Sequence, residues 1–94
     1  MKICIIGLGL IGGSIAIDLR KRGFTNYIIG VDSNKLHLQT ALNIGLIDHA
    51  TDLEEAIHTS ELIILAIPAN ETIRILPGIL DRIEHQFVTD TCSI

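Results

Sequence analysis

Three glycines near the N-terminus stand at the spacing G-x-G-x-x-G, in the segment Gly7-Leu8-Gly9-Leu10-Ile11-Gly12. A backbone without Cβ atoms can approach a negatively charged group closely, and a helix that begins there offers unpaired amides and the positive end of its dipole. Such a turn predicts a binding site for the pyrophosphate of a dinucleotide. Because glycines also recur by chance at this spacing, the prediction depends on the elements around them.

Each position of this turn has its own predicted role in holding the cofactor. Gly7 permits the tight passage from strand to helix, and Gly9 lets the backbone approach the pyrophosphate. Gly12 lets the helix pack closely on the preceding strand. The first-turn amides of Leu10 and Ile11 are predicted to point at the phosphates.

Asp32 lies 20 positions after Gly12, at the end of the next apolar run. An acidic side chain there accepts hydrogen bonds from the adenosine ribose hydroxyls, and its charge repels the 2′-phosphate of NADP. Ser33, in the same loop, is a further candidate for contact with the cofactor. No arginine stands at positions 33–35, which favours NAD, although Lys35 leaves NADP as an alternative. Another alternative is that Asp32 only caps the following helix.

A third candidate segment is Ala66-Ile67-Pro68, which ends another apolar run. At the end of a parallel strand, these residues would lie beside the cofactor where it crosses the edge of the sheet. The alternative for Pro68 is a plain strand terminator, since proline lacks the amide that a strand needs.

The other residue types that could do chemistry form no recognisable pattern. The four histidines lack metal-binding spacing and are expected to be solvated surface groups, so no metal site is predicted. They are His37, His49, His58 and His85. The sequence also lacks a nucleophile elbow, a paired-carboxylate motif and a Walker lysine.

Apolar, β-branched runs alternate with segments of helical period along the chain. The predicted strands are Lys2–Ile6, Tyr27–Val31, Asp48–Ala50, Leu62–Ile67 and Phe87–Thr89. The first predicted helix is Leu10–Arg22, with Ile11, Ile15 and Leu19 on one stripe, and the second is capped by Ser33 or Asn34. A capping box at Thr51–Glu54 begins a brief third helix. The fourth helix is capped by Asn70 and is kinked or split at Pro77-Gly78. Strands that are apolar on both faces imply an α/β fold, a doubly wound parallel sheet of Rossmann type that binds ligands at the carboxyl ends of its strands.

The composition fits one small globular domain. Of the 94 residues 48% are apolar and 19% charged, and the net charge of -4 argues against nucleic acid or an anionic membrane as partner. Two cysteines, Cys4 and Cys92, are too few for a disulfide framework, so a reducing cytoplasm is expected. A signal peptide is an alternative for the apolar N-terminus, but its four glycines and single basic flanking residue argue against it.

Five segments closely resemble those of prephenate dehydrogenases, over essentially the whole chain. They are Gly7–Ser14, Gly30–Asp32, Gly45–Asp48, Leu65–Pro68 and Val88–Asp90. The double glycine followed by serine is more specific than the general fingerprint, and the related arogenate dehydrogenases share much of the pattern. The resemblance implies NAD-dependent oxidation of prephenate with loss of carbon dioxide, which gives 4-hydroxyphenylpyruvate in tyrosine biosynthesis. It also implies cofactor contacts for the three glycines of the turn and for Asp32.

The same resemblance assigns a catalytic role to Ser93, near the nicotinamide and the substrate hydroxyl. Cys92 stands where the family has glycine, so this turn departs from the family pattern. The family's catalytic histidine and its helical domain, which supplies substrate arginines and homodimer contacts, would follow beyond residue 94. We therefore expect residues 1–94 to be a truncated cofactor domain that is inactive alone. The alternatives are a dehydrogenase of similar fold for another acid, and an NAD-binding regulatory module without catalysis.

Overall fold

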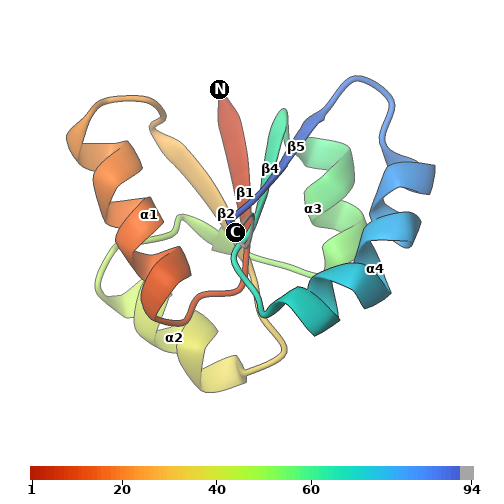
Figure 1. The fold of residues 1–94 in the computed structure, drawn as a ribbon. Helices are drawn as coiled ribbons and strands as arrows, with labels where there is room; N and C mark the ends of the chain where they lie inside the picture. The colour runs from red at the N-terminus through yellow and green to blue at the C-terminus, as the bar shows by residue number, and fades with distance from the viewer. Residues whose placement is uncertain (92–94) are drawn as a thin grey trace.

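The computed structural model describes residues 1–91, which contain one sheet of five parallel strands (Figure 1). The strands are β1 (Lys2–Ile6), β2 (Tyr27–Val31), β3 (His49–Ala50), β4 (Leu62–Leu65) and β5 (Phe87–Asp90). Their spatial order is β3-β2-β1-β4-β5, with β1 at the centre. The chain therefore winds outward from β1 in both directions, which confirms the doubly wound α/β fold expected from the sequence.

Four helices within residues 1–91 cover the two faces of this sheet. Helices α1 (Leu10–Lys21) and α2 (Lys35–Asn43) lie on one side, and α3 (Leu53–Thr59) and α4 (Ala69–Arg82) lie on the other (Figure 1). The helices that follow β1 and β2 lie on one face of the sheet, and the helices that follow β3 and β4 lie on the other. The direction of winding therefore reverses between β1 and β4, which are neighbours in the sheet. The loops that follow β1, β2 and β4 consequently meet at one edge, where a wound sheet binds its ligands.

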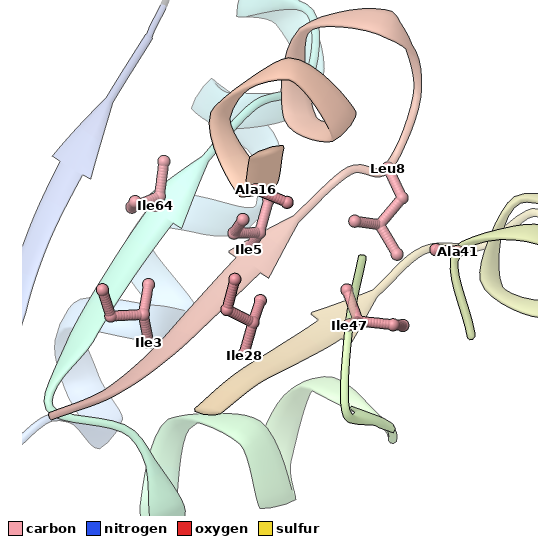
Figure 2. Packing of buried hydrophobic residues seen from close by; sticks show 8 residues of the cluster. All are labelled: Ile3, Ile5, Leu8, Ala16, Ile28, Ala41, Ile47 and Ile64. Carbon is pink, nitrogen blue, oxygen red and sulfur yellow. The ribbon is translucent and has the colours of Figure 1, made fainter. Parts of the chain in front are cut away.

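The central strands are buried because helices cover both of their faces. On the α1–α2 face, Ile3 and Ile5 of β1 pack with Ile28 of β2 and Ile64 of β4, and Ala16 brings α1 onto this layer (Figure 2). The cluster on the α3–α4 face is Cys4, Ile6, Ile29, Ala56, Ile57, Ile63, Leu65 and Ile79. Because each fully buried isoleucine contributes about 1.5–3 kcal/mol, these two layers supply most of the hydrophobic stabilisation.

Cys4 is one of the fully buried residues of the second layer. Burial raises the pKa of its thiol to about 12, although a hydrogen bond with Ser60 acts in the opposite direction. The thiol is therefore protonated at neutral pH, and it serves as a small apolar core residue rather than as a nucleophile.

Helix α1 contacts the sheet through small residues, which corrects the predicted stripe. Gly12 and Ala16 are buried, and Ile15 and Leu19 are partly buried, whereas Ile11 is 58% exposed. A helix that carries glycine and alanine on its inner face can approach the strands more closely than one that carries isoleucine. The buried face of α1 is therefore the one with the smallest side chains, which allow the helix to lie close to the strands, and not the one with the most hydrophobic side chains.

Two helix starts refine the sequence prediction. Of the two candidates for α2, Asn34 is the cap, and its Oδ1 accepts hydrogen bonds from the amides of Leu36 and His37 at 2.9 and 3.3 Å. Helix α3 is capped by Asp52, whose Oδ1 accepts from the Glu55 amide at 2.9 Å. The predicted capping box was thus one residue too early, because the carboxylate of Asp52 is the group that reaches the third helical amide.

The prediction for the start of α4 was wrong. The helix begins at Ala69, with Pro68 at the cap position, and the Pro68 carbonyl accepts from the amides of Glu71 and Thr72, each at 3.0 Å. Asn70 consequently lies inside the first turn. The helix is also not split at Pro77, because Pro77 lies on an exposed side of α4 where water can hydrate the carbonyl that loses its donor.

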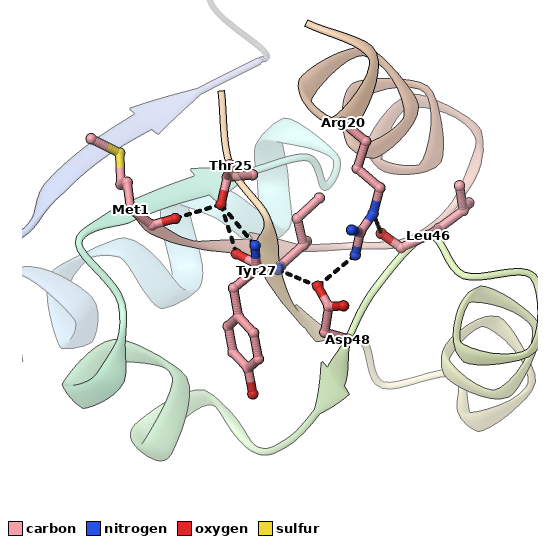
Figure 3. A network of polar contacts seen from close by, with 7 residues as sticks. Met1, Arg20, Thr25, Tyr27, Leu46 and Asp48 are labelled. Atoms are coloured by element: carbon pink, nitrogen blue, oxygen red, sulfur yellow. Dashed lines mark hydrogen bonds and ion pairs between the residues drawn. The ribbon is translucent and has the colours of Figure 1, made fainter. Parts of the chain in front are cut away.

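Asp48, at the end of the Gly45–Asp48 segment, joins three parts of the fold (Figure 3). Its Oδ2 accepts hydrogen bonds from the Ile28 amide at 2.8 Å and from Arg20 Nη2 at 2.5 Å. Arg20 Nε also donates to the Leu46 carbonyl at 3.1 Å. These contacts fix α1, β2 and the entry to β3 relative to one another, so this family-like segment has a structural role.

Candidate dinucleotide site

A cavity of about 390 Å³ opens at the carboxyl ends of β1, β2 and β4. Its lining residues are Ile6, Gly7, Gly9, Val31, Asp32, Ser33, Asn34, His37, Leu53, Ala66, Ile67, Pro68, Glu71, Arg74 and Ile75. This volume lies within the range of roughly 300–1,000 Å³ that is typical of small-molecule sites. The structure thus brings together the three segments that the sequence singled out, from the turns after β1, β2 and β4.

The glycine turn after β1 is shaped by backbone packing. Gly7 has a φ of +97°, and a Cβ there would lie 2.6 Å from the Ala66 carbonyl oxygen. A Cβ on Gly12 would lie 1.8 Å from the Gly7 carbonyl oxygen. Both contacts are too short for any side chain. The protein fold itself therefore requires glycine at these two positions.

Gly9 differs from these two glycines. A Cβ added to Gly9 would meet no protein atom within 4 Å, and the residue lines the cavity. Its backbone has a φ of −73°, which any residue can adopt. Folding therefore does not require glycine at position 9. A ligand that approaches the backbone closely from the cavity would require it, because a Cβ would occupy the space that the ligand needs.

The start of α1 presents amides without protein partners. Gly9 caps the helix without a side-chain hydrogen bond, and no described residue accepts from the amides of Leu10 or Ile11. The Leu10 side chain is 90% exposed and lines a second cavity between α1 and α2, of about 330 Å³. Neither Leu10, Ile11 nor Gly12 lines the first cavity, whose wall at the glycine turn is formed by Gly7 and Gly9.

Asp32 lines the cavity, and its carboxylate accepts three hydrogen bonds. Its Oδ2 accepts from the Leu8 amide at 2.8 Å and lies 3.0 Å from His37 Nδ1, and its Oδ1 accepts from the Asn34 amide at 2.8 Å. Burial acts to raise the pKa of this carboxyl, but the Asn34 and Leu8 amides and the His37 ring together outweigh it and lower the pKa. Asp32 is therefore ionised at neutral pH and held in one orientation.

His37 is the residue that the sequence prediction misjudged. It lines the cavity and touches the Asp32 carboxylate, so the expectation that all four histidines are merely solvated surface groups is wrong for this one. The local fold explains the contact, because the Asn34 cap holds the first turn of α2 beside the end of β2. Within residues 1–91, no group of three or more histidine, cysteine or acidic side chains has metal-binding geometry.

The turn after β4 forms the opposite wall of the cavity. Ala66, Ile67 and Pro68 line it beyond the end of the strand, which is shorter than predicted, and the Ala66 carbonyl lies against Gly7. Glu71 and Arg74 extend this wall along α4 and were not predicted. Ser93, the predicted catalytic residue, and its neighbour Cys92 lie outside the described residues.

Comparison with known proteins agrees with this geometry. The family described as "Prephenate dehydrogenase, nucleotide-binding domain" matches residues 15–94. The match begins after the glycine turn at 7–12, so it does not depend on that common motif. In addition, no helix in the part of the chain that the structure describes has the length and apolar character needed to cross a membrane.

Individual relatives agree with the family match. The prephenate dehydrogenase of Lactococcus lactis subsp. cremoris is 36% identical, over 98% of this chain and 26% of that protein. The crystal structure of Synechocystis arogenate dehydrogenase superposes with a TM-score of 0.87 at 35% identity, over 100% of this chain and 34% of that one. The prephenate dehydrogenase of Aquifex aeolicus, in complex with hydroxyphenyl propionate and NAD⁺, superposes with a TM-score of 0.82 at 30% identity, over 96% and 32%.

The present chain thus spans about a quarter of the Lactococcus protein and a third of the two solved chains. The family match covers most of its length, and its sheet order and its cavity are those that a nucleotide-binding domain requires. The chain belongs to the family of prephenate dehydrogenase nucleotide-binding domains.

Proposed function

We propose that this chain binds NAD in the cavity at the carboxyl ends of β1, β2 and β4, as the cofactor-binding portion of a prephenate dehydrogenase. The observation that carries the proposal is Gly9, which has no packing reason to be glycine and faces the cavity that also contains Asp32. A dinucleotide needs both features, a bare backbone for its pyrophosphate and a carboxylate for its ribose.

The residues in and beside the cavity suit the parts of NAD in turn. The free amides of Leu10 and Ile11, with the α1 dipole, would hold the pyrophosphate above Gly9. Asp32 retains one acceptor position on Oδ1 for a ribose hydroxyl, since a carboxylate has about four and the protein fills three. Ser33 and the Ala66–Pro68 segment would border the adenosine and the crossing of the sheet edge.

In the complete enzyme, bound NAD would accept a hydride from prephenate while carbon dioxide is lost, which gives 4-hydroxyphenylpyruvate. Further residues of a longer protein would supply the catalytic histidine, the helical substrate domain and the homodimer contacts. Ser93 would lie near the nicotinamide and the substrate hydroxyl. For the 94-residue chain alone we expect cofactor binding without turnover. A cytoplasmic location stays a prediction.

Calorimetric titration of the chain with NAD and, separately, with NADP tests this proposal. We expect saturable NAD binding, weaker binding of NADP, and NAD binding reduced about tenfold or more by Asp32→Ala, because a hydrogen bond to a charged group is lost. Circular dichroism of each variant confirms that it is folded. A folded chain that binds neither nucleotide would exclude the proposal.

Arogenate is a second candidate substrate of the complete enzyme, because the Synechocystis structure with a TM-score of 0.87 is an arogenate dehydrogenase. Turnover of each acid by a protein that contains this chain and its substrate domain distinguishes the two candidates. An NAD-binding module that regulates a partner without chemistry would bind NAD equally well but turn over neither acid.

A further inference from the structure

We infer that His37 is a positioning residue that sets the preference between NAD and NADP by acting on the Asp32 carboxylate. The inference rests on the proposed function, because it concerns the same dinucleotide site. It assigns to α2 a role in cofactor specificity, in addition to the role expected for Asp32 at the end of β2. The effect of His37 should depend on whether its ring is neutral or protonated.

The position of the His37 ring is fixed by the local fold. The Asn34 side chain accepts hydrogen bonds from the amides of Leu36 and His37, so the first turn of α2 lies directly beside the end of β2. There His37 Nδ1 lies 3.0 Å from Asp32 Oδ2. The Asp32 side chain is only 11% exposed, whereas that of His37 is 44% exposed. The histidine therefore covers the carboxylate and remains accessible to protons from solvent.

The Asp32 oxygens are then unequal toward a ligand. The Leu8 amide and His37 occupy Oδ2, whereas Oδ1 accepts only from the Asn34 amide. A ribose hydroxyl can therefore be accepted at Oδ1 without displacing any protein group. In this arrangement His37 directs the cofactor to Oδ1.

The charge of His37 also decides how strongly Asp32 repels a 2′-phosphate. Histidine ordinarily changes charge between pH 5 and 8. A neutral ring leaves the full negative charge of Asp32 facing the ribose, whereas a protonated ring forms an ion pair with it and cancels most of the local charge. Discrimination against NADP should therefore be strongest at high pH and weaken as the pH falls.

The other charged groups near His37 are few. Among the described residues, the first cavity also contains Glu71 and Arg74, both from α4, and the second cavity contributes no further charged side chain from α1. Lys35 stands two positions earlier on α2 and is exposed. Of these groups, only His37 is within hydrogen-bonding distance of Asp32. The part of the pH dependence that comes from the protein should therefore be lost when His37 is replaced, although the other charges remain.

The test is calorimetric titration of the 94-residue chain with NAD and with NADP at pH 6 and pH 8.5. The matched variant is His37→Asn, whose amide nitrogen can take the place of Nδ1 but does not titrate. His58→Asn, on α3 and outside both cavities, is the control. The 2′-phosphate itself titrates near pH 6, so the comparison between proteins, not the wild-type value, carries the result.

We expect the ratio of the NADP to the NAD dissociation constant to fall by about fivefold more in the wild type than in His37→Asn between pH 8.5 and pH 6, which is the scale of a partly exposed ion pair. His58→Asn should behave as the wild type. An equal change of this ratio in wild type and His37→Asn would overturn the inference while leaving NAD binding established. A folded wild-type chain that binds neither nucleotide would reject the proposed function, and the inference with it.

Discussion

The turns that follow β1 and β2 line the same cavity but are held by different forces. In the first turn, Gly7 and Gly12 are required because a Cβ would collide with backbone carbonyl oxygens at 2.6 and 1.8 Å. In the second turn, Asp32 accepts hydrogen bonds from two amides and a histidine ring. Steric exclusion shapes one turn and polar contacts shape the other.

This difference separates the folding role of each turn from its binding role. Overlap with the backbone cannot be relieved by moving a side chain, so substitutions at the packed glycines of the first turn should act on stability. The polar contacts of the second turn are individually worth about 1 kcal/mol, so substitutions there should leave the chain folded. Gly9 is the exception within the first turn, because its surroundings are open.

The largest effect is expected for Gly12→Ala. Its Cβ would lie 1.8 Å from the Gly7 carbonyl oxygen, so the helix must move away from β1, and we expect the free energy of unfolding to fall by about 3 kcal/mol or more. Urea denaturation followed by circular dichroism measures this change. Gly13→Ala is the matched control, since its Cβ would lie 3.8 Å from Leu46 Cδ1 and alanine favours the helix. Equal stability of the two variants would contradict the steric account.

A smaller and different effect is expected for Gly9→Ala. The added methyl group meets no protein atom, so the free energy of unfolding should change by less than about 1 kcal/mol, which is the scale of a changed helix cap. The methyl group would instead occupy space needed by the pyrophosphate, and NAD affinity should fall about tenfold. Calorimetry and urea denaturation of the same sample separate these quantities. Unchanged affinity would show that the cofactor does not approach this backbone.

The effect on stability expected for Asp32→Asn is small and depends on pH. The pKa of Asp32 is lowered in the folded chain, so its contribution is present above the unfolded pKa of about 4 and is lost as the pH falls through the lower folded value. The variant should be less stable than the wild type by about 1 kcal/mol at pH 7, and the two should converge in acid. Urea denaturation at pH 7 and pH 3 measures this, and a constant difference would show that ionisation of Asp32 does not stabilise the fold.

Much of the architecture could be predicted because the strand pattern is unambiguous. Apolar runs such as Lys2–Ile6 and Tyr27–Val31 form the expected strands, and their alternation with helices predicts the doubly wound parallel sheet that is found. The inner face of α1 could not be predicted from hydrophobicity, because Gly12 and Ala16 are buried while Ile11 is not. Which side of a helix approaches a sheet most closely depends on the shape of the turn before it.

The candidate site was predictable where one short segment contains the chemistry. The glycine turn and Asp32 are local signals, and Gly7, Gly9 and Asp32 line one cavity. His37 required knowledge of how the loop after Asp32 folds back. Arg74 comes from a helix on the other side of the switch point, and its approach to this cavity depends on the neighbouring placement of β1 and β4. Sequence spacing contains no information about such an approach.

The central place of β1 also has a consequence for biosynthesis. This strand is synthesised before the other four described strands, yet one of its two neighbours is β4, where Leu62 pairs with Ile3. At about 5–20 residues per second, the ribosome needs several seconds to supply that partner. Until then, the apolar edge of β1 stays open to pairing with other chains. Early docking of β2 protects only one side, so nascent chains stalled before β4 should be the species most prone to aggregate.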